Sequence, residues 1–259
     1  MMFEQQLDEH LDAIALKVSR EISEADKMSM PGAEGWYFNV GRDALKHILI
    51  SLMLSRPRPR VERVLDFACG HGRVARFLHA AFPDTSLVGS DTNVSGVSFV
   101  SEHLGFEKHI SKAVPSENSF IMPFDLIWCG SLLTHLDQEN SIGLIKMFAD
   151  NLTPGGVAVF TSHGRYVASK VNEKTFPYIL SRDEFSRICD DFNRTGFGFS
   201  EYTHLETPDG SGISLTSTAW LYETIASLKN VKIIYFSERA WGNHQDVIAI
   251  QKVEVGAGV

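Results

Sequence analysis

Cysteine, positive charge and long apolar stretches are all scarce in this sequence. Its 259 residues include three cysteines, an odd and sparse set that argues against a disulfide framework, so we expect a reducing, cytoplasmic location. The formal net charge of -8 disfavours the broad basic surface that binding along a nucleic acid requires. No nucleic-acid partner is therefore expected.

The apolar stretches are too short to cross a membrane. The most apolar one, at 44–55, is interrupted by Lys46 and His47 and falls short of the about 20 residues that a bilayer requires. The N-terminus MMFEQQLDEHLD carries acids where a secretory signal carries lysines and an apolar run. We therefore expect neither membrane insertion nor export.

What the sequence does contain is typical of a globular α/β protein. Apolar residues make up 44% of the chain and charged residues 22%. After a loop with Pro and Gly at 28–41, the helical period predicts a helix at 42–55, and we expect residues 1–60 to form an N-terminal helical cap. An earlier amphipathic helix is predicted from apolar residues at spacings of three and four: Phe3, Leu7, Leu11, Ile14, Val18 and Ile22.

From residue 61 on, short apolar runs alternate with helical periods. This alternation predicts right-handed crossovers and a Rossmann-like three-layer α/β/α sandwich around a mostly parallel sheet. Ligands bind to such a sheet at the carboxyl ends of its strands. Strands are predicted at 61–68, 85–91, 124–130 and 157–162, helices at 73–82, 95–105 and 139–152, and a turn at 154–156.

The C-terminal part is expected to extend this main domain, which covers 61–259. Residues at about 165–215 are predicted to form a small β/α insertion that covers the active site. The predicted elements are a helix at 181–196 capped by Ser181 and ended near Gly196, strands at 197–205 and 212–217 joined by a turn at 207–211, a helix from about Ser217, and strands at 231–241 and 246–252.

A glycine-containing loop, VLDFACGHGR at 64–73, is the first candidate for a ligand site. Gly70 and Gly72 let the backbone turn sharply and approach a ligand, because no Cβ intervenes. Alone they leave open a nucleotide phosphate, a metal or another ligand. Asp66, at the end of the first predicted strand, would repel a diphosphate but suits an ammonium group. A cationic, phosphate-free nucleoside therefore fits these residues best.

A metal is not expected at this loop. Cys69, His71, Cys129 and His135 could supply soft ligands from neighbouring strand ends, but no C-x-x-C or H-x-x-x-H pair is formed among them. We interpret His71, between two glycines, as a loop residue that contributes its backbone.

The loop resembles the first motif of class I S-adenosylmethionine-dependent methyltransferases, and the likeness covers about residues 61–164. It implies a seven-stranded sheet with an antiparallel last strand, and S-adenosylmethionine as the cofactor. An acid after strand two would accept from the ribose hydroxyls, and Asp91 follows Asp66 by 25 residues, near the about 20 expected. The implied cofactor-binding residues are Asp66, Ala68, Cys69, Gly70, Gly72 and Arg73 in the first motif, Asp91 and Thr92 after strand two, Cys129, Gly130 and Ser131 after strand four, Leu132 or Leu133 on the adenine side, and Tyr37 as a lid or core residue.

Two positions depart from the family pattern. Ala68 stands where many members have glycine. The third strand, near 106–114, lacks the acid that often binds the adenine amino group, and Ser111, Lys112 and Ala113 are the nearest candidates, with backbone contacts as the alternative.

The acceptor side of the site is less well defined by the sequence. Methyl transfer from a sulfonium is an in-line displacement, so alignment and exclusion of water supply most of the acceleration and a base is optional. A base would help a hydroxyl acceptor. The candidates, each with an ordinary structural role as its alternative, are His135 and His163 as bases, Tyr166, Trp241 and His244 as substrate contacts, and the connection at 238–246 as an overhang above the acceptor pocket.

We therefore expect a methyltransferase acting on a small-molecule or saccharide acceptor, as a monomer or homodimer. The saccharide preference rests on FACGHGR, SLLTHL and WGNHQD, which together resemble bacterial methyltransferases found near or fused to glycosyltransferases. The alternatives are an NAD(P)-dependent Rossmann oxidoreductase, which Asp66 and the expected lack of a catalytic Tyr-x-x-x-Lys pattern disfavour, and a non-catalytic cofactor-binding protein. The sequence does not define whether oxygen, nitrogen, carbon or sulfur is methylated.

Overall fold

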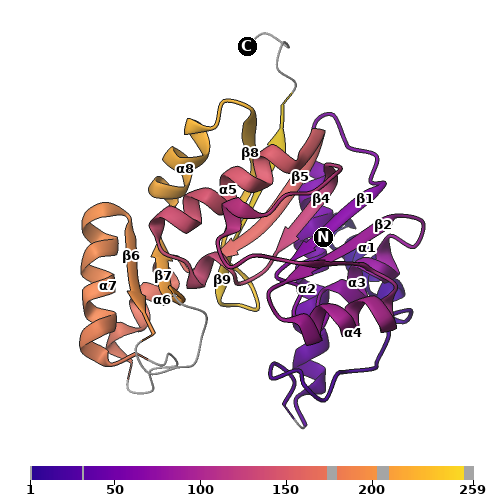
Figure 1. The fold of residues 1–259 in the computed structure, drawn as a ribbon, viewed down its shortest axis with the longest axis horizontal. Coiled ribbons are helices and arrows are strands. Elements are labelled where there is room, and N and C mark those ends of the chain that lie inside the picture. The colour runs from indigo at the N-terminus through magenta and orange to yellow at the C-terminus, as the bar shows by residue number, and fades with distance from the viewer. Residues whose placement is uncertain (1, 31, 174–179, 203–209, 254–259) are drawn as a thin grey trace.

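The computed structural model describes residues 2–30, 32–173, 180–202 and 210–253. Its centre is a seven-stranded sheet in the order β3-β2-β1-β4-β5-β9-β8 (Figure 1). Neighbouring strands from β3 to β5 are parallel, and β9 is antiparallel to both β5 and β8. The predicted sandwich with an antiparallel last strand is therefore confirmed. The strands are β1 Arg63–Phe67, β2 Ser86–Asp91, β3 Glu107–Ile110, β4 Phe124–Cys129, β5 Leu152–Ser162, β8 Val231–Trp241 and β9 Gln245–Lys252.

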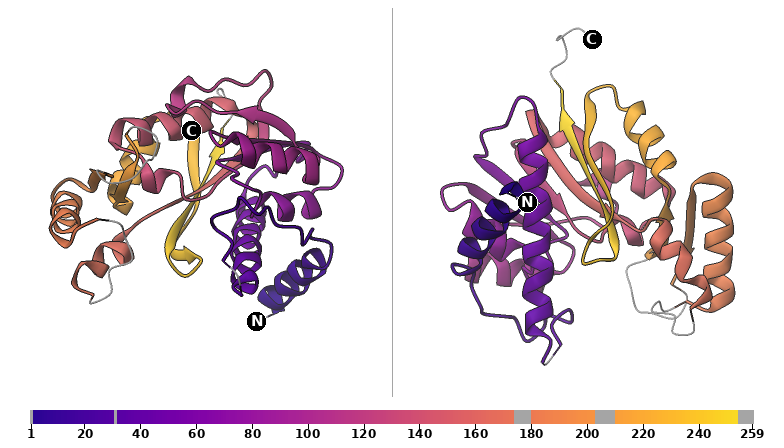
Figure 2. Two further views of the ribbon diagram at one scale, coloured as in Figure 1. Left: turned by 60° about the horizontal axis from the view of Figure 1, so that its bottom comes forward. Right: turned by 180° about the vertical axis from the view of Figure 1, so that it is seen from behind.

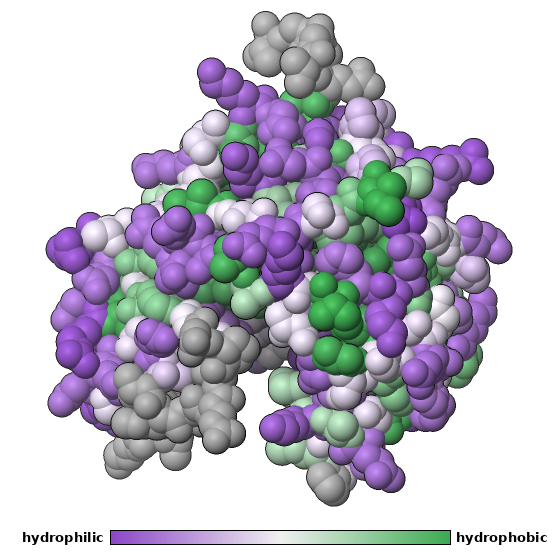
Figure 3. All heavy atoms as spheres, viewed as in Figure 1, coloured by the Kyte–Doolittle hydropathy of each residue, from purple (hydrophilic) through white to green (hydrophobic). Residues whose placement is uncertain are grey.

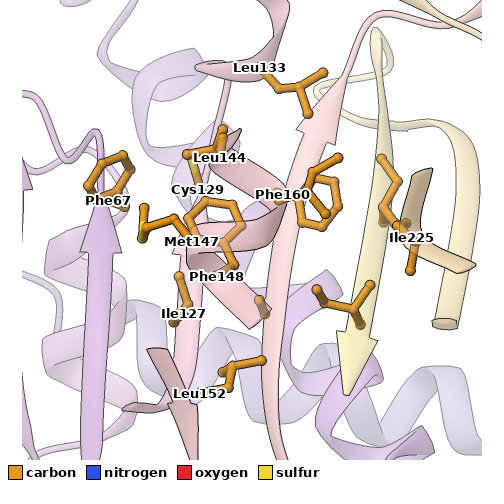
Figure 4. Packing of buried hydrophobic residues seen from close by; sticks show 14 of the residues in the cluster. Phe67, Ile127, Cys129, Leu133, Leu144, Met147, Phe148, Leu152, Phe160 and Ile225 are labelled. Carbon is orange, nitrogen blue, oxygen red and sulfur yellow. The ribbon is translucent and has the colours of Figure 1, made fainter. Parts of the chain in front are cut away.

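Helices cover both faces of the sheet. Helices α2 (Glu34–Leu54), α3 (Ala75–Ala81) and α4 (Val94–Leu104) share a buried apolar cluster with one face. Helices α5 (Gln138–Asn151) and α8 (Thr218–Ser227) cover the other, where aromatic and aliphatic side chains pack across β1, β4 and β5 (Figure 4). These two cores make the sheet a rigid platform whose strand ends can position a ligand.

The N-terminal helices differ from their predicted bounds. Helix α1 (Met2–Ala15) ends before Val18 and Ile22, although Val18 is buried in the cluster that joins α1 to α2 and α3. Helix α2 begins at Glu34, inside the predicted loop. Gly41 contributed to the prediction of a loop, but the structure gives it a different role. A Cβ at this position would lie 2.5 Å from the ring of Phe77, so only glycine leaves room for that ring. Gly41 is thus a packing glycine within a helix. Helix α2 lies beside α1 and against the sheet (Figure 2, right).

The small insertion forms its own layer beside the sheet (Figure 1). The antiparallel pair of β6 (Phe197–Glu201) and β7 (Gly212–Thr216) packs on α7 (Arg182–Thr195) through a separate apolar cluster. The predicted ends of α7 are confirmed, since Ser181 forms a capping box and Gly196 has a left-handed backbone. The predicted turn at 207–211 lies mostly outside the described residues. Short helices precede this layer: α6 Arg165–Ala168 and η3 Ser169–Asn172.

One predicted turn is instead part of a strand. The turn expected at 154–156 lies within β5, which runs continuously from Leu152 to Ser162. Proline and glycine are accommodated there because the pairing with β4 shifts register between Phe124 and Leu126. Two further 3₁₀ turns, η1 Pro115–Glu117 and η2 Leu133–His135, follow β3 and β4.

Candidate active site

A cavity of about 460 Å³ opens at the carboxyl ends of β1, β2 and β4. In the view of Figure 3 the molecule is hollowed at its lower edge, beside the N-terminal segment. The cavity contains predicted residues from three separate motifs, so the strand ends bring them together as expected. Those that line it are Asp66, Ala68, Cys69, Gly70, Arg73, Asp91, Gly130, Ser131, His135 and Trp241.

Asp66 is a buried carboxylate with an unsatisfied oxygen. Its side chain is at the end of β1 and 1% exposed, and Oδ2 has no hydrogen-bond partner among the described residues. Burial raises the pKa of Asp66 well above its ordinary value, the Asp91 carboxylate raises it further, and Arg73 opposes both. A buried acceptor without a partner is costly. A cationic donor placed in the cavity would satisfy it.

Asp91 and the glycine loop form one hydrogen-bonded unit. The Gly70 amide donates to Asp91 Oδ2 at 2.8 Å, and the Asn93 amide donates to Oδ1 at 2.8 Å. Gly70 has a φ of 51°, which glycine adopts without strain. The Asp91 carboxylate is thereby fixed at the rim of the cavity, with further lone pairs able to accept from hydroxyl groups.

Arg73 supplies positive charge to the same cavity. Its guanidinium carbon lies 5.6 Å from the ring centre of Trp36 and 5.7 Å from that of Trp241. Burial lowers the pKa of Arg73, and the nearby Tyr37, Asp26 and Asp66 raise it. Arg73 thus lies beside two aromatic rings and lines the cavity, where its guanidinium can donate to an anionic group.

Two residues with strained backbones border the cavity. Ala68 and Ser131, at the ends of β1 and β4, both have a φ of 65°. This left-handed conformation costs a residue with a Cβ about 1–2 kcal/mol. Ser131 is kept there because its amide donates to Thr161 Oγ1 at 2.7 Å and its hydroxyl accepts from Gln245 Nε2 at 2.8 Å.

A second, smaller cavity of about 60 Å³ lies on the other side of Ala68 and Asp91. Leu132 lines both cavities, so the two adjoin along one row of residues. The predicted adenine candidates gather here. The other lining residues are Phe67, Thr92, Ser111, Lys112, Ala113 and Pro115.

His135 lines the main cavity from η2. Its Nδ1 lies 2.9 Å from the Gly212 carbonyl oxygen and 3.3 Å from the Tyr202 hydroxyl. Because a carbonyl only accepts, we assign the proton of the neutral ring to Nδ1, which leaves Nε2 as a proton acceptor. Burial lowers the pKa of His135 below its ordinary value, partly opposed by Gly212. The ring is therefore neutral at pH 7.

Six predicted site residues line neither cavity. Cys129 is buried in the core under the sheet edge, and Gly72 lies against Leu104 of α4. Tyr37 is buried, and its hydroxyl donates to Asp26 Oδ2 at 2.7 Å. The other three, His163, Tyr166 and His244, lie together after the end of β5. The ring centre of His244 is 5.3 Å from that of His163 and 6.1 Å from that of Tyr166.

Tyr166 also has the Tyr-x-x-x-Lys spacing, with Lys170, that nicotinamide-dependent oxidoreductases use as a catalytic pair. The Lys170 ammonium lies 4.5 Å from the Tyr166 ring centre and is ion-paired with Glu173. Neither residue lines either cavity described above. The spacing therefore does not favour an oxidoreductase at this site.

Several cavity residues were missed by the sequence reasoning. Ala25, Asp26, Lys27 and Met28 form one side of the cavity, and Trp128 lies at its base. Trp128 lies in the predicted fourth strand, directly before Cys129. The four residues at 25–28 carry no motif. They reach the cavity because a connection far from the glycine loop in sequence returns to it, and no local pattern predicts that.

The observed geometry fits a class I S-adenosylmethionine-dependent methyltransferase. Acids end β1 and β2, a glycine loop joins them, and the antiparallel β9 completes the sheet. The unsatisfied Oδ2 of Asp66 matches a cationic ligand such as an amino-acid ammonium group. The family profile described as a methyltransferase domain matches residues 41–199, and the chain belongs to this family. The predictions of this class and of S-adenosylmethionine as its cofactor are thus confirmed.

Individual relatives are distant in sequence and similar in fold. The chain is 22% identical over 218 residues to a malonyl-[acyl-carrier protein] O-methyltransferase of Haemophilus ducreyi, covering 80% of this chain and 78% of that protein. An S-adenosylmethionine-dependent methyltransferase of Clostridium acetobutylicum superposes with a TM-score of 0.56 at 12% identity, covering 84% and 92%. An amino pentose methyltransferase of Micromonospora echinaspora, solved with S-adenosylmethionine, gives 0.53 at 14% identity, also covering 84% and 92%.

Two other kinds of feature are absent from the described residues. No group of three or more histidine, cysteine, aspartate or glutamate side chains is arranged there to hold a metal ion. No helix in those ranges has the length and apolar character needed to span a bilayer.

Proposed function

We propose that this chain transfers the methyl group of S-adenosylmethionine to a small-molecule or saccharide acceptor. The observation that carries the proposal is the buried, unsatisfied Asp66 carboxylate, which faces the same cavity as Arg73 and Asp91. The three side chains offer a negative, a positive and a hydrogen-bond-accepting group, as a zwitterionic amino acid joined to a ribose requires. When bound, the cofactor supplies an electrophilic methyl carbon.

Each part of the cofactor has a matching group in the protein. Asp66 would accept from the ammonium group, and Arg73 would donate to the carboxylate in a bidentate pair. Asp91, fixed by two backbone amides, would accept from the ribose hydroxyls. The small cavity lined by Ser111, Lys112, Ala113, Thr92 and Leu132 would take the adenine ring.

His135 is the proposed proton acceptor. It lines the cavity, its Nδ1 is occupied by the Gly212 carbonyl, and its lowered pKa keeps Nε2 unprotonated at pH 7. A hydroxyl acceptor would deliver its proton to Nε2 as its oxygen bonds to the methyl carbon, while the methyl–sulfur bond breaks and S-adenosylhomocysteine is left. An amine or thiol acceptor would depend on His135 less.

The acceptor class rests on weaker support. The structural neighbour is named as an amino pentose methyltransferase, which fits a saccharide acceptor, whereas the curated relative is named for malonyl-[acyl-carrier protein]. We place the acceptor between the main cavity and the insertion at 165–215, near His163, Tyr166 and His244. Three buried free cysteines support the reducing compartment expected from the sequence.

Binding followed by turnover tests the proposal. Calorimetry should detect binding of S-adenosylmethionine and none of NAD, and Asp91→Ala should weaken binding by about 1–3 kcal/mol. Incubation with methyl-labelled cofactor and fractionated small-molecule and saccharide extracts should then yield a labelled product. Binding of NAD alone would overturn the proposal, and binding without any labelled product would favour a non-catalytic protein.

A further inference from the structure

One side of the main cavity comes from a segment that precedes the family-matched region. Ala25, Asp26, Lys27 and Met28 line the cavity, whereas the methyltransferase profile begins at residue 41. These residues belong to the connection between α1 and α2. We call residues 19–28 the N-terminal strap. The cavity keeps the side formed by residues 25–28 only while the strap stays in this position.

Arg76 is the residue that joins the strap to the glycine loop. It lies on α3, is fully buried, and uses all five of its N–H donors. Two donate to strap carbonyls, with Nη1 3.0 Å from Ser19 O and 2.6 Å from Glu21 O. Two donate to the glycine loop, with Nε 2.9 Å from Gly72 O and Nη2 3.4 Å from His71 O.

The fifth donor of Arg76 is connected through the Tyr37 hydroxyl to Asp26, the acidic residue of the strap that lines the cavity. Nη2 lies 3.4 Å from the Tyr37 hydroxyl, which in turn donates to Asp26 Oδ2 at 2.7 Å. Asp26 is 7% exposed, and its Oδ1 accepts from the Met28 amide at 3.0 Å. Burial lowers the pKa of Arg76, and Tyr37 and Asp26 raise it. Asp26 is therefore the nearby negative charge that makes a buried guanidinium tolerable.

We propose that Arg76 is a positioning residue that holds the N-terminal strap over the cofactor cavity, so that the strap controls cofactor retention. This inference rests on the proposed function, because it concerns the same cavity. Arg76 does not line the cavity itself, and it acts by tying the strap and the loop to one group. Release of Ser19 and Glu21 from the guanidinium would open the side formed by residues 25–28.

The hydrogen bonds that join the strap to the glycine loop require an arginine at position 76. Its planar fork reaches five acceptors in fixed directions, whereas a lysine ammonium has three donors on a flexible stem. Arg76→Lys keeps the charge but leaves at least two of the five carbonyl and hydroxyl acceptors without a donor. Tyr37→Phe keeps Arg76 and the buried ring and removes only the link to Asp26.

The test measures two rates in each variant: the rate at which the cofactor dissociates and the rate at which trypsin cleaves the strap. For Arg76→Lys we expect the dissociation rate of S-adenosylhomocysteine, followed by tryptophan fluorescence, to rise at least about tenfold, and that of Tyr37→Phe to rise less. The KM for S-adenosylmethionine should rise while kcat at saturating cofactor changes little. Trypsin should cleave faster at Arg20 and Lys27 in both variants, and bound cofactor should slow cleavage of the wild type.

Arg42→Lys is the matched control. Arg42 ties α1 to α2 through Asp8 and Asp12, outside the strap, so its replacement should loosen α1 and leave the dissociation rate unchanged. An unchanged dissociation rate in both Arg76→Lys and Tyr37→Phe, with faster trypsin cleavage, would overturn the proposal. If Arg76→Lys does not fold, Tyr37→Phe decides alone. Wild-type protein that binds no cofactor would instead refute the proposed function, and the cleavage comparison would still test the junction.

Discussion

Replacing Asp66 by asparagine is expected to change cofactor affinity and stability in opposite directions. Asp66 is buried, its Oδ2 has no partner within the described ranges, and burial together with Asp91 raises its pKa. Ionised Asp66 therefore destabilises the ligand-free protein, and an ammonium group in the cavity would supply the missing partner.

The magnitudes follow from what the substitution removes. A hydrogen bond to a charged group contributes about 1.5–3 kcal/mol, so Asp66→Asn should raise the Kd for S-adenosylmethionine by about 10- to 150-fold. Asparagine keeps the shape and removes the buried charge. Because ionised Asp66 is a buried charge without a partner and the asparagine amide is neutral, the free energy of unfolding of the ligand-free variant at pH 8 should exceed that of the wild type by about 1 kcal/mol.

The stability difference should also depend on pH. A carboxyl group whose pKa is raised by folding binds its proton more tightly in the native state, so its contribution to stability is present at low pH and is lost as the pH rises through the raised pKa. The gain from Asp66→Asn should therefore be smaller at pH 5 than at pH 8.

Urea denaturation at the two pH values and calorimetric titration with cofactor measure both effects. Asp84→Asn makes the same change of charge at an exposed turn before β2 and should alter neither quantity. Wild-type affinity in Asp66→Asn, or a ligand-free variant less stable than the wild type at pH 8, would refute the assignment of Asp66 to the ammonium group.

Three further substitutions test other parts of the site. His135→Gln should lower kcat for a hydroxyl acceptor by about 100-fold in a methyl-transfer assay, with cofactor affinity retained, and the wild-type rate should fall only below about pH 6.5 because burial lowers the His135 pKa. Equal rates in the two proteins would remove the proposed base. Asp246→Asn should raise the free energy of unfolding by about 2 kcal/mol at pH 8 and by less at pH 5. Burial raises the pKa of Asp246 to about 6, so its ionised form is disfavoured in the folded protein. A loss of stability at pH 8 would contradict this. Ala68→Gly should raise the melting temperature slightly, since relief of about 1–2 kcal/mol at a φ of 65° exceeds the about 0.5–1 kcal/mol entropy cost of glycine; a lower melting temperature would show that the alanine methyl contributes packing.

The parts of the fold that could be predicted are those encoded locally. The strand–loop–helix from 61 to 82 and the cap of α7 at Ser181 each depend on residues within one turn of the chain. Asp66 and Asp91 each follow a predicted strand, and the resemblance to the methyltransferase family implied their roles. The two acids come together because parallel strands end at the same edge of the sheet.

What could not be predicted depends on contacts between distant segments. Gly41 has the composition of a turn and lies in a helix because Phe77 packs where its side chain would be. Nothing near Arg76 in the sequence shows that its donors reach Ser19 and Glu21. Likewise, Gln245 reaches Ser131 only after β9 has paired with β5.

The place of β9 within the sheet has a consequence for synthesis of the chain. Strand β9 lies between β5 and β8, although it is made after every other strand of the sheet. Until it emerges, the apolar edge of β5 has no neighbour and is open to pairing with another chain. Gln245, at the start of β9, is also the residue that donates to the Ser131 hydroxyl. The cavity residue Ser131 therefore gains this support only when the last strand of the sheet has been made.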